Sequence, residues 1–135
     1  MNNAEFREEK RKKYNEHLTN SGVFWAFNKE QFEEGKKAHP LDEGEKYVDI
    51  GMGGFIRKSQ FNAFLKGMVE IKKWIKLEAM KIKHNKEEAE KAILYELNNH
   101  EAFYTGSIDD AFEDLKEDGY TKSEVLDVYK KHNTA

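Results

Sequence analysis

The longest regular pattern of apolar residues in the chain runs from residue 59 to residue 83. Apolar side chains recur there at spacings of three and four, which is the period of one face of an α-helix. The members of this stripe are Phe61, Phe64, Leu65, Met68, Ile71, Ile75, Ala79 and Ile82, with Trp74 at its edge. The pattern predicts one long amphipathic helix, capped by Ser59, which we expect to be the spine of the fold.

Three short apolar runs before this helix predict a small sheet. They are residues 23–27, 47–50 and 55–56. The glycine-rich residues 51–54 separate the last two runs, which is typical of a hairpin. A capping pattern from Asn28 to Gln31 predicts a helix between the first two strands that ends near Gly35.

Capping residues after the spine helix predict three shorter helices, because their side-chain oxygens can accept bonds from free first-turn amides. The helices begin after Asn85, Ser107 and Thr121. Residues 1–20 form a weakly amphipathic helix that either lies on the surface or orders only on binding. The predicted fold class is therefore α+β and mostly helical, with a small, about three-stranded antiparallel sheet packed on a long amphipathic helix followed by three short helices.

The length of 135 residues indicates a single domain over residues 1–135. We expect an N-terminal helix over residues 1–20, a small sheet with one helix over residues 22–58, and a helical part over residues 59–135. Nine Phe, six Tyr and two Trp supply bulk for its core.

The chain has no cysteine, which excludes disulfides, thiolate metal sites and a cysteine nucleophile. No apolar run is long enough to span a membrane, and the N-terminus has no apolar signal region. We therefore expect a cytoplasmic protein without a membrane partner.

The net charge of −3 conceals two segments of opposite sign. Residues 57–91 carry a net charge of +5 and residues 101–127 a net charge of −7. Either the segments face each other or are separately solvated, or one of them is a docking surface. The candidate partner-binding residues are Asp109, Asp110, Glu113 and Asp114 on the acidic side, and Lys66, Lys73 and Lys76 on the basic side.

On the acidic side, the same-face pair Asp110 and Asp114 could bind a divalent cation or act in acid–base chemistry, although acidic residues at the start of a helix are also typical of a solvated face. Two further polar clusters could carry chemistry. Gly51, Gly53 and Gly54, with Arg57 and Lys58, form a candidate anion loop, since glycines admit a phosphate to the backbone. A tight turn with positive φ explains the same glycines.

Asn99, His100 and Glu101 form the second cluster, and Glu96 lies one helical turn before His100. Histidine and carboxylate can act as base or metal ligands, but they also satisfy the end of a helix. A metal site needs three or four convergent ligands. Spacing alone does not show them, so we expect no catalytic residue, no metal and no cofactor.

The aromatic run from Phe24 to Phe27 also has two interpretations. A stacking platform for bases needs exposed aromatic rings beside cations. A continuous aromatic run is more typical of a buried strand, and we expect that here.

Three stretches together resemble a known group of proteins. They are residues 22–32 (GVFWAFNKEQF), 50–58 (IGMGGFIRK) and 96–106 (ELNNHEAFYTG). The chain resembles small proteins of unknown function carried by phages and conjugative elements of gut and related bacteria. The resemblance implies an accessory role in a mobile element and, for a phage-encoded chain, the host cytoplasm as location. It carries over no catalytic residue.

These observations favour a binding protein over an enzyme. The expected partner is a host or element-encoded protein, and the expected role is inhibition of a host defence nuclease complex through charged surfaces, in the manner of an anti-CRISPR protein. One alternative is a nucleic-acid-binding protein that uses the basic helix face. Another is a small metal-dependent hydrolase around His100 and Glu101. The oligomeric state is left open.

Overall fold

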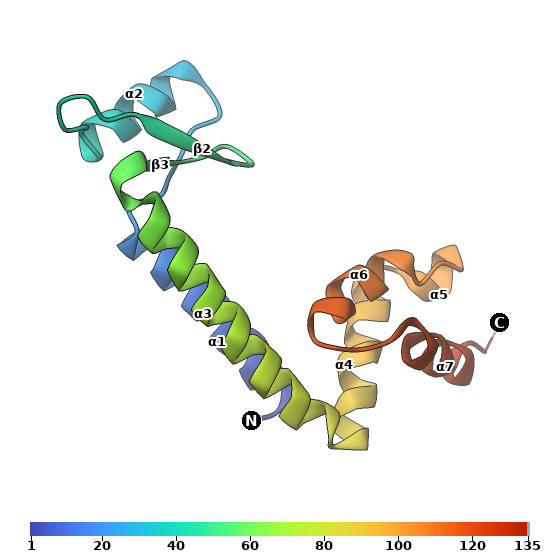
Figure 1. Cartoon of the computed structure of the whole chain (residues 1–135). Helices are drawn as coiled ribbons and strands as arrows, with labels where there is room; N and C mark the ends of the chain where they lie inside the picture. Colours follow the sequence, from blue (N-terminus) through green and yellow to red (C-terminus); the bar gives the residue numbers. More distant parts are fainter. Residues whose placement is uncertain (135) are drawn as a thin grey trace. The chain divides into compact units, whose positions relative to one another are not determined.

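A computed structural model describes residues 1–134 and confirms a mostly helical α+β fold with a small antiparallel sheet (Figure 1). The elements are α1 (Asn3–Asn20), β1 (Phe24–Trp25), α2 (Lys29–Ala38), β2 (Tyr47–Gly51), β3 (Gly54–Arg57), α3 (Lys58–Lys83), α4 (Lys86–Asn99), α5 (Ala102–Thr105), α6 (Asp109–Glu117) and α7 (Lys122–His132). Their contacts define two compact units. We call residues 10–72 the sheet unit, and residues 1–9 with 73–134 the helical unit.

The sheet unit is built on three antiparallel strands in the order β1-β3-β2. Buried Ile56 of β3 packs with Val23 and Phe64, which joins the sheet to α3. A second group of rings surrounds Phe24, which is 7% exposed. Its partners are Phe32, His39, Tyr47 and Phe55, with ring centroids 5.4 to 6.0 Å from that of Phe24.

Within the sheet unit, α1 and α3 approach closely, and Figure 1 shows the second half of α1 beside the first half of α3. The imidazole of His17 in α1 lies directly against the backbone of Gly67 in α3. A Cβ atom on Gly67 would stand only 2.0 Å from the imidazole Cε1. The imidazole Nε2 donates a hydrogen bond to the carbonyl oxygen of Phe64, 2.8 Å away, and the ring stacks on the Phe64 ring. A glycine in α3 therefore makes room for the contact that joins the two helices.

Two helix ends in the sheet unit differ from the sequence prediction. The side chain of Asn28 caps α2 as predicted, accepting a hydrogen bond from the Gln31 amide. However, α2 continues through Gly35 to Ala38. The prediction that Ser59 caps α3 is wrong, because Ser59 already lies within α3. The helix begins at Lys58, directly after β3, and the Lys58 amide donates a hydrogen bond to the Lys46 carbonyl.

The helical unit packs α4 to α7 around one apolar core. Its buried members are Ile93, Leu97, Ala102, Ile108, Ala111, Leu115, Tyr120 and Val125. Thr121 and Glu124 form the predicted capping box of α7, each side chain bonding to the other's backbone amide. Asn85 caps α4, while the Glu88 carboxylate accepts bonds from Asn3 of α1 instead.

The start of α6 and the short helix α5 differ from the sequence prediction. The N-cap position of α6 is Ile108, not Ser107, although the Ser107 hydroxyl accepts a long bond of 3.4 Å from the Asp109 amide. The single turn α5 was not predicted. It follows Glu101, whose backbone is left-handed with φ 54°.

Burial of Tyr120 provides a test of the helical core. Burial, reinforced by the Asp118, Glu124 and Glu88 carboxylates, raises the pKa of Tyr120 to about 12. The unfolded phenol ionises near pH 10, so its ionisation favours the unfolded state as the pH rises from there. Between pH 9 and pH 11 we expect wild type to lose about 1 kcal/mol more unfolding free energy than Tyr120→Phe. Urea unfolding at the two pH values measures this; equal losses would contradict it.

Candidate functional site

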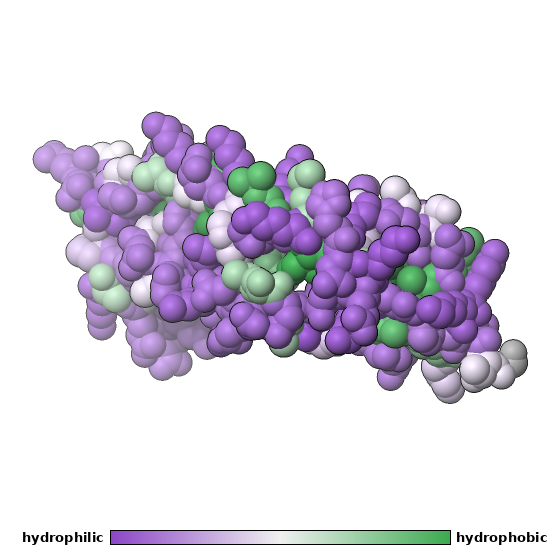
Figure 2. Space-filling model, turned by 90° about the horizontal axis from the view of Figure 1, so that it is seen from below, coloured by the Kyte–Doolittle hydropathy of each residue, from purple (hydrophilic) through white to green (hydrophobic). Residues whose placement is uncertain are grey.

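The surface seen in Figure 2 is mostly hydrophilic, and its hydrophobic residues form small, separate patches. None of the helices in residues 1–134 combines the length and apolar character needed to cross a bilayer. Large apolar side chains that remain in solvent are candidates for an interaction surface. They include Trp25, Phe27, Leu65, Val69, Leu77, Met80, Tyr95, Tyr104 and Met52.

Three of these residues lie where β1 meets the turn between β2 and β3. Trp25 is 47% exposed, Phe27 74% and Met52 92%. We call these three residues the aromatic turn patch. Side chains alternate along the extended segment, so Phe24 and Ala26 enter the core while Trp25 and Phe27 point outward. The aromatic run is thus half core and half surface.

Two glycines form the floor of the aromatic turn patch. A Cβ atom on Gly53 would lie 2.4 Å from the Phe27 ring, and one on Gly54 would lie 2.8 Å from the Trp25 ring. The rings therefore lie directly on the backbone of β3 and its turn. The Ala26 amide also donates a bond of 2.8 Å to the Gly53 carbonyl. These contacts hold the exposed rings in place.

Met52 occupies an unusual position for a large apolar residue. It and Gly53 are the central residues of the two-residue turn, with φ values of 54° and 82°. Turns of this kind favour Asn, Asp or Gly at both positions, because other residues are strained there. The Asp49 carboxylate fixes the turn by accepting a bond of 2.7 Å from the Gly51 amide. The turn therefore presents a methionine at some cost in backbone energy.

The residues of the glycine-rich candidate anion loop have structural roles in the turn and in ion pairs. Gly51, Gly53 and Gly54 serve the turn and the rings above it. The Arg57 guanidinium is bound by the Glu45 carboxylate at 2.6 Å and by the Asp42 carboxylate at 2.8 Å. The Glu45 bond also raises the pKa of Arg57. Lys58 is exposed at the start of α3. Because two carboxylates already neutralise Arg57, little positive charge remains in the loop to attract an anion.

The structure brings His100 together with acidic residues that the sequence analysis had treated separately. His100 Nε2 donates a hydrogen bond to Asp114 Oδ2 at 2.7 Å, and it lies 3.5 Å from Glu96 Oε2. The bond to Asp114, with the nearby charges of Glu96 and Asp110, raises the pKa of His100. Neighbouring Asn99 and Glu101 are exposed. We call Glu96, His100 and Asp114 the histidine–carboxylate cluster.

The remaining charged candidates lie on helix surfaces. Asp109, Asp110 and Glu113 are exposed on α6, and Asp109 has Lys122 at 3.5 Å. Lys66, Lys73 and Lys76 are exposed on α3. Each set follows one helix, so neither forms a cleft.

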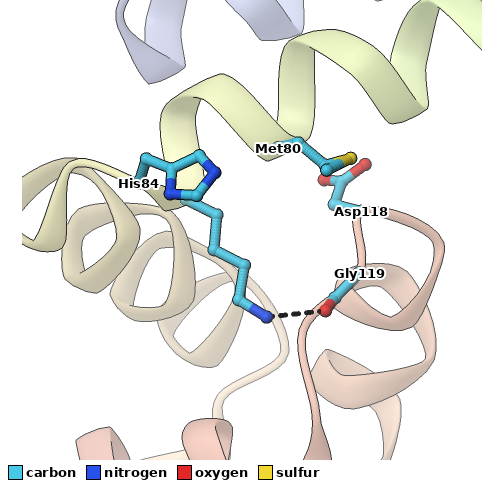
Figure 3. A pocket seen from close by; sticks show the side chains of 5 residues that line it. Met80, His84, Asp118 and Gly119 are labelled. Atoms are coloured by element: carbon cyan, nitrogen blue, oxygen red, sulfur yellow. Dashed lines mark hydrogen bonds between the residues drawn. The ribbon is translucent and has the colours of Figure 1, made fainter.

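A hollow of about 360 Å³ lies beside the end of α3 (Figure 3). Met80, His84, Asp118 and Gly119 line it together with Lys83. The Lys83 ammonium is bonded to the Gly119 carbonyl at 2.9 Å and to the Glu124 carboxylate at 2.8 Å. Its charge thus stabilises the junction of α3 with α7.

A model of a family of unknown function, DUF7659, matches residues 6–134. The chain belongs to the DUF7659 family. The match includes the aromatic turn patch and the histidine–carboxylate cluster. No curated protein and no solved structure matches the chain.

Sequence reasoning missed Trp25, Phe27 and Met52 as surface residues of this DUF7659 protein. The signal for the first two was the two-residue period of a strand, which puts alternate members of an aromatic run on opposite faces. The signal for Met52 was a bulky residue between Gly51 and Gly53, where a tight turn favours small or polar residues.

Proposed function

We propose that this DUF7659 protein acts by binding a partner protein through the aromatic turn patch. The observation that carries the proposal is the exposure of Trp25, Phe27 and Met52 around one turn. Aromatic residues and methionine are enriched in protein interfaces, where their burial contributes much of the binding free energy. Gly53 and Gly54 beneath the rings also favour binding. Rings that are already held in place lose little conformational freedom when a partner binds.

A partner protein fits this patch better than a nucleic acid does. Base stacking on exposed rings works together with cations that track the phosphates. Arg7, Lys36 and Lys83 lie over the rings of Tyr95, Phe32 and Tyr120, and no cation of residues 1–134 is found over Trp25 or Phe27. A strained, exposed methionine is also suited to an apolar protein surface, because its thioether side chain adapts to irregular shapes.

The class of partner follows from the resemblance to small proteins of phages and conjugative elements. On that basis we propose an accessory role in a mobile element, with a host protein such as a defence nuclease complex as the partner. The acidic residues Asp109, Asp110 and Glu113 would give a second contact to the basic, phosphate-binding surface of such a complex. Charged contacts of this kind contribute more to association rate than to affinity.

A double variant, Phe27→Ser with Met52→Ser, tests the proposal. Both side chains are largely in solvent, so the fold should be retained. Proteins retained from a host lysate by immobilised wild type and variant are compared by quantitative mass spectrometry. We expect the specific partner to be reduced at least about tenfold with the variant, because truncating two interface anchors costs about 2 kcal/mol or more.

The matched control is Tyr104→Ser, which removes a side chain that is 91% exposed in the helical unit. The partner should be retained at the wild-type level by this control. Equal retention by wild type, double variant and control would refute the patch as the binding surface. A variant with Asp110→Asn and Glu113→Gln then shows whether the acidic surface contributes, through a slower association at low salt.

A further inference from the structure

The histidine–carboxylate cluster has the composition and convergence of a metal site. One ligand atom each from Glu96, His100 and Asp114 lies within 4.8 Å of the other two. Zinc is held by imidazole nitrogen and carboxylate oxygen at about 2.0 to 2.2 Å, so two ligands of a tetrahedral ion lie about 3.4 Å apart. The observed 3.5 Å between His100 Nε2 and Glu96 Oε2 matches that spacing.

The bond from His100 to Asp114 must open by less than 1 Å to admit an ion, from its present 2.7 Å. Asp114 has room for this movement, since its side chain is 58% exposed. The ion would take the place of the proton that the imidazole and the carboxylate now share. This movement falls on an exposed aspartate side chain, while His100 and Glu96 already stand at the required separation.

The scaffold holds these ligands from two packed helices. Glu96 lies in the last turn of α4, and His100 is the residue that caps that helix. Asp114 lies on α6, and it is flanked by the buried Leu115. Leu97, Ala111 and Leu115 of the common core, each at most 2% exposed, fix one helix against the other. Ligands on helices that are locked by core packing are held more firmly than ligands on loops.

The local field also favours a cation. The carbonyl end of α4 carries partial negative charge, and His100 lies at that end. Asp110, one turn before Asp114 on α6, adds a third carboxylate whose charge acts on His100. A divalent ion would neutralise part of this negative charge.

We propose that Glu96, His100 and Asp114 form a binding site for a divalent transition-metal ion of the zinc class. The imidazole distinguishes such ions from Mg²⁺ and Ca²⁺, which prefer oxygen ligands alone. Three protein ligands leave at least one coordination position for water or for a partner's side chain. The proposal does not depend on the aromatic turn patch.

A second pair in the helical unit provides an internal control. His132 Nε2 lies 2.6 Å from Glu90 Oε1, a pairing much like that of His100 with Asp114. The neighbour of this pair is the Lys131 ammonium, 2.9 Å from the same carboxylate oxygen. A cation is repelled there, so a histidine–carboxylate contact alone should not bind zinc in this protein.

Calorimetric titration of the full chain with Zn²⁺ in a non-chelating buffer tests the site. We expect one ion per chain, affinity reduced at least about tenfold in His100→Gln and in Asp114→Asn, and no change in His132→Gln. Millimolar Mg²⁺ should not displace the ion. Cobalt substitution gives a second readout, since a tetrahedral Co²⁺ spectrum should appear in wild type and in His132→Gln and disappear in Asp114→Asn.

Absence of a stoichiometric Zn²⁺ binding step would overturn the proposal, and so would binding that survives both His100→Gln and Asp114→Asn. Displacement by Mg²⁺ would also overturn it, by showing a site without the imidazole. Should His100→Gln fail to fold, Glu96→Gln takes its place with the same expectation. None of these results depends on the identity of the protein partner.

Discussion

Replacing Gly35 with alanine should destabilise the sheet unit by about 2 kcal/mol, although the same change inside a helix ordinarily stabilises by about 1 kcal/mol. The reason is the Phe24 ring. A Cβ atom on Gly35 would lie 2.1 Å from Phe24 Cδ2 and 2.4 Å from Cε2, well inside van der Waals contact. The ring has little room to retreat, because His39, Tyr47 and Phe55 surround it. Either α2 moves away from the sheet or the aromatic cluster repacks.

Urea unfolding of Gly35→Ala, Phe24→Leu and the double variant measures this effect. Leucine removes ring carbons that the new methyl group would meet, so the double variant should lose less free energy of unfolding than the sum of the two single variants. A more stable Gly35→Ala protein would contradict the position of the ring on α2. Additive losses would show that the two residues do not contact each other.

Local signals in the sequence predicted those parts of the fold that depend on neighbouring residues. The capping box of Thr121 and Glu124 is confirmed, because both partners lie within one helical turn. The predicted end of α2 at Gly35 failed for the opposite reason. Glycine there does not end the helix but admits the Phe24 ring from β1, and nothing in the sequence around residue 35 records that contact.

The start of α3 also depends on a contact with a residue distant in the sequence. Ser59 is a good capping residue by type, but the amide of the preceding Lys58 already has the Lys46 carbonyl as its partner. That bond belongs to the end of the β2–β3 ladder. The strand therefore passes directly into the helix, and a local rule that looks for a cap places the boundary two residues too late.

The histidine–carboxylate cluster could be predicted only in part. Glu96 and His100 are four residues apart on one helix, so their proximity followed from the helical period. Asp114 lies fourteen residues after His100, on another helix, and the sequence around it predicts an acidic surface or a carboxylate pair with Asp110, not a partner for His100. Only the packing of α4 against α6 turns two ordinary features, a helix end and an acidic face, into one set of convergent ligands.

The core that holds those two helices together should be the most sensitive part of the helical unit. Leu97 of α4 is fully buried, and Ala102, Ala111 and Val125 are fully buried with it in the same cluster. Leu97→Ala should reduce the free energy of unfolding by about 3 to 4 kcal/mol, through lost burial and the cavity that remains. Small neighbours such as Ala102 and Ala111 have no side-chain freedom with which to fill that space.

Leu77→Ala is the matched control, since it removes the same atoms from a helix position that is 62% exposed. Its effect on the unfolding free energy should stay within about 0.5 kcal/mol. A loss of less than about 1 kcal/mol in Leu97→Ala would mean that α4 and α6 can close around the cavity. That result would also weaken the case for a rigid Glu96, His100 and Asp114 site, because the same packing sets the distances among its ligands.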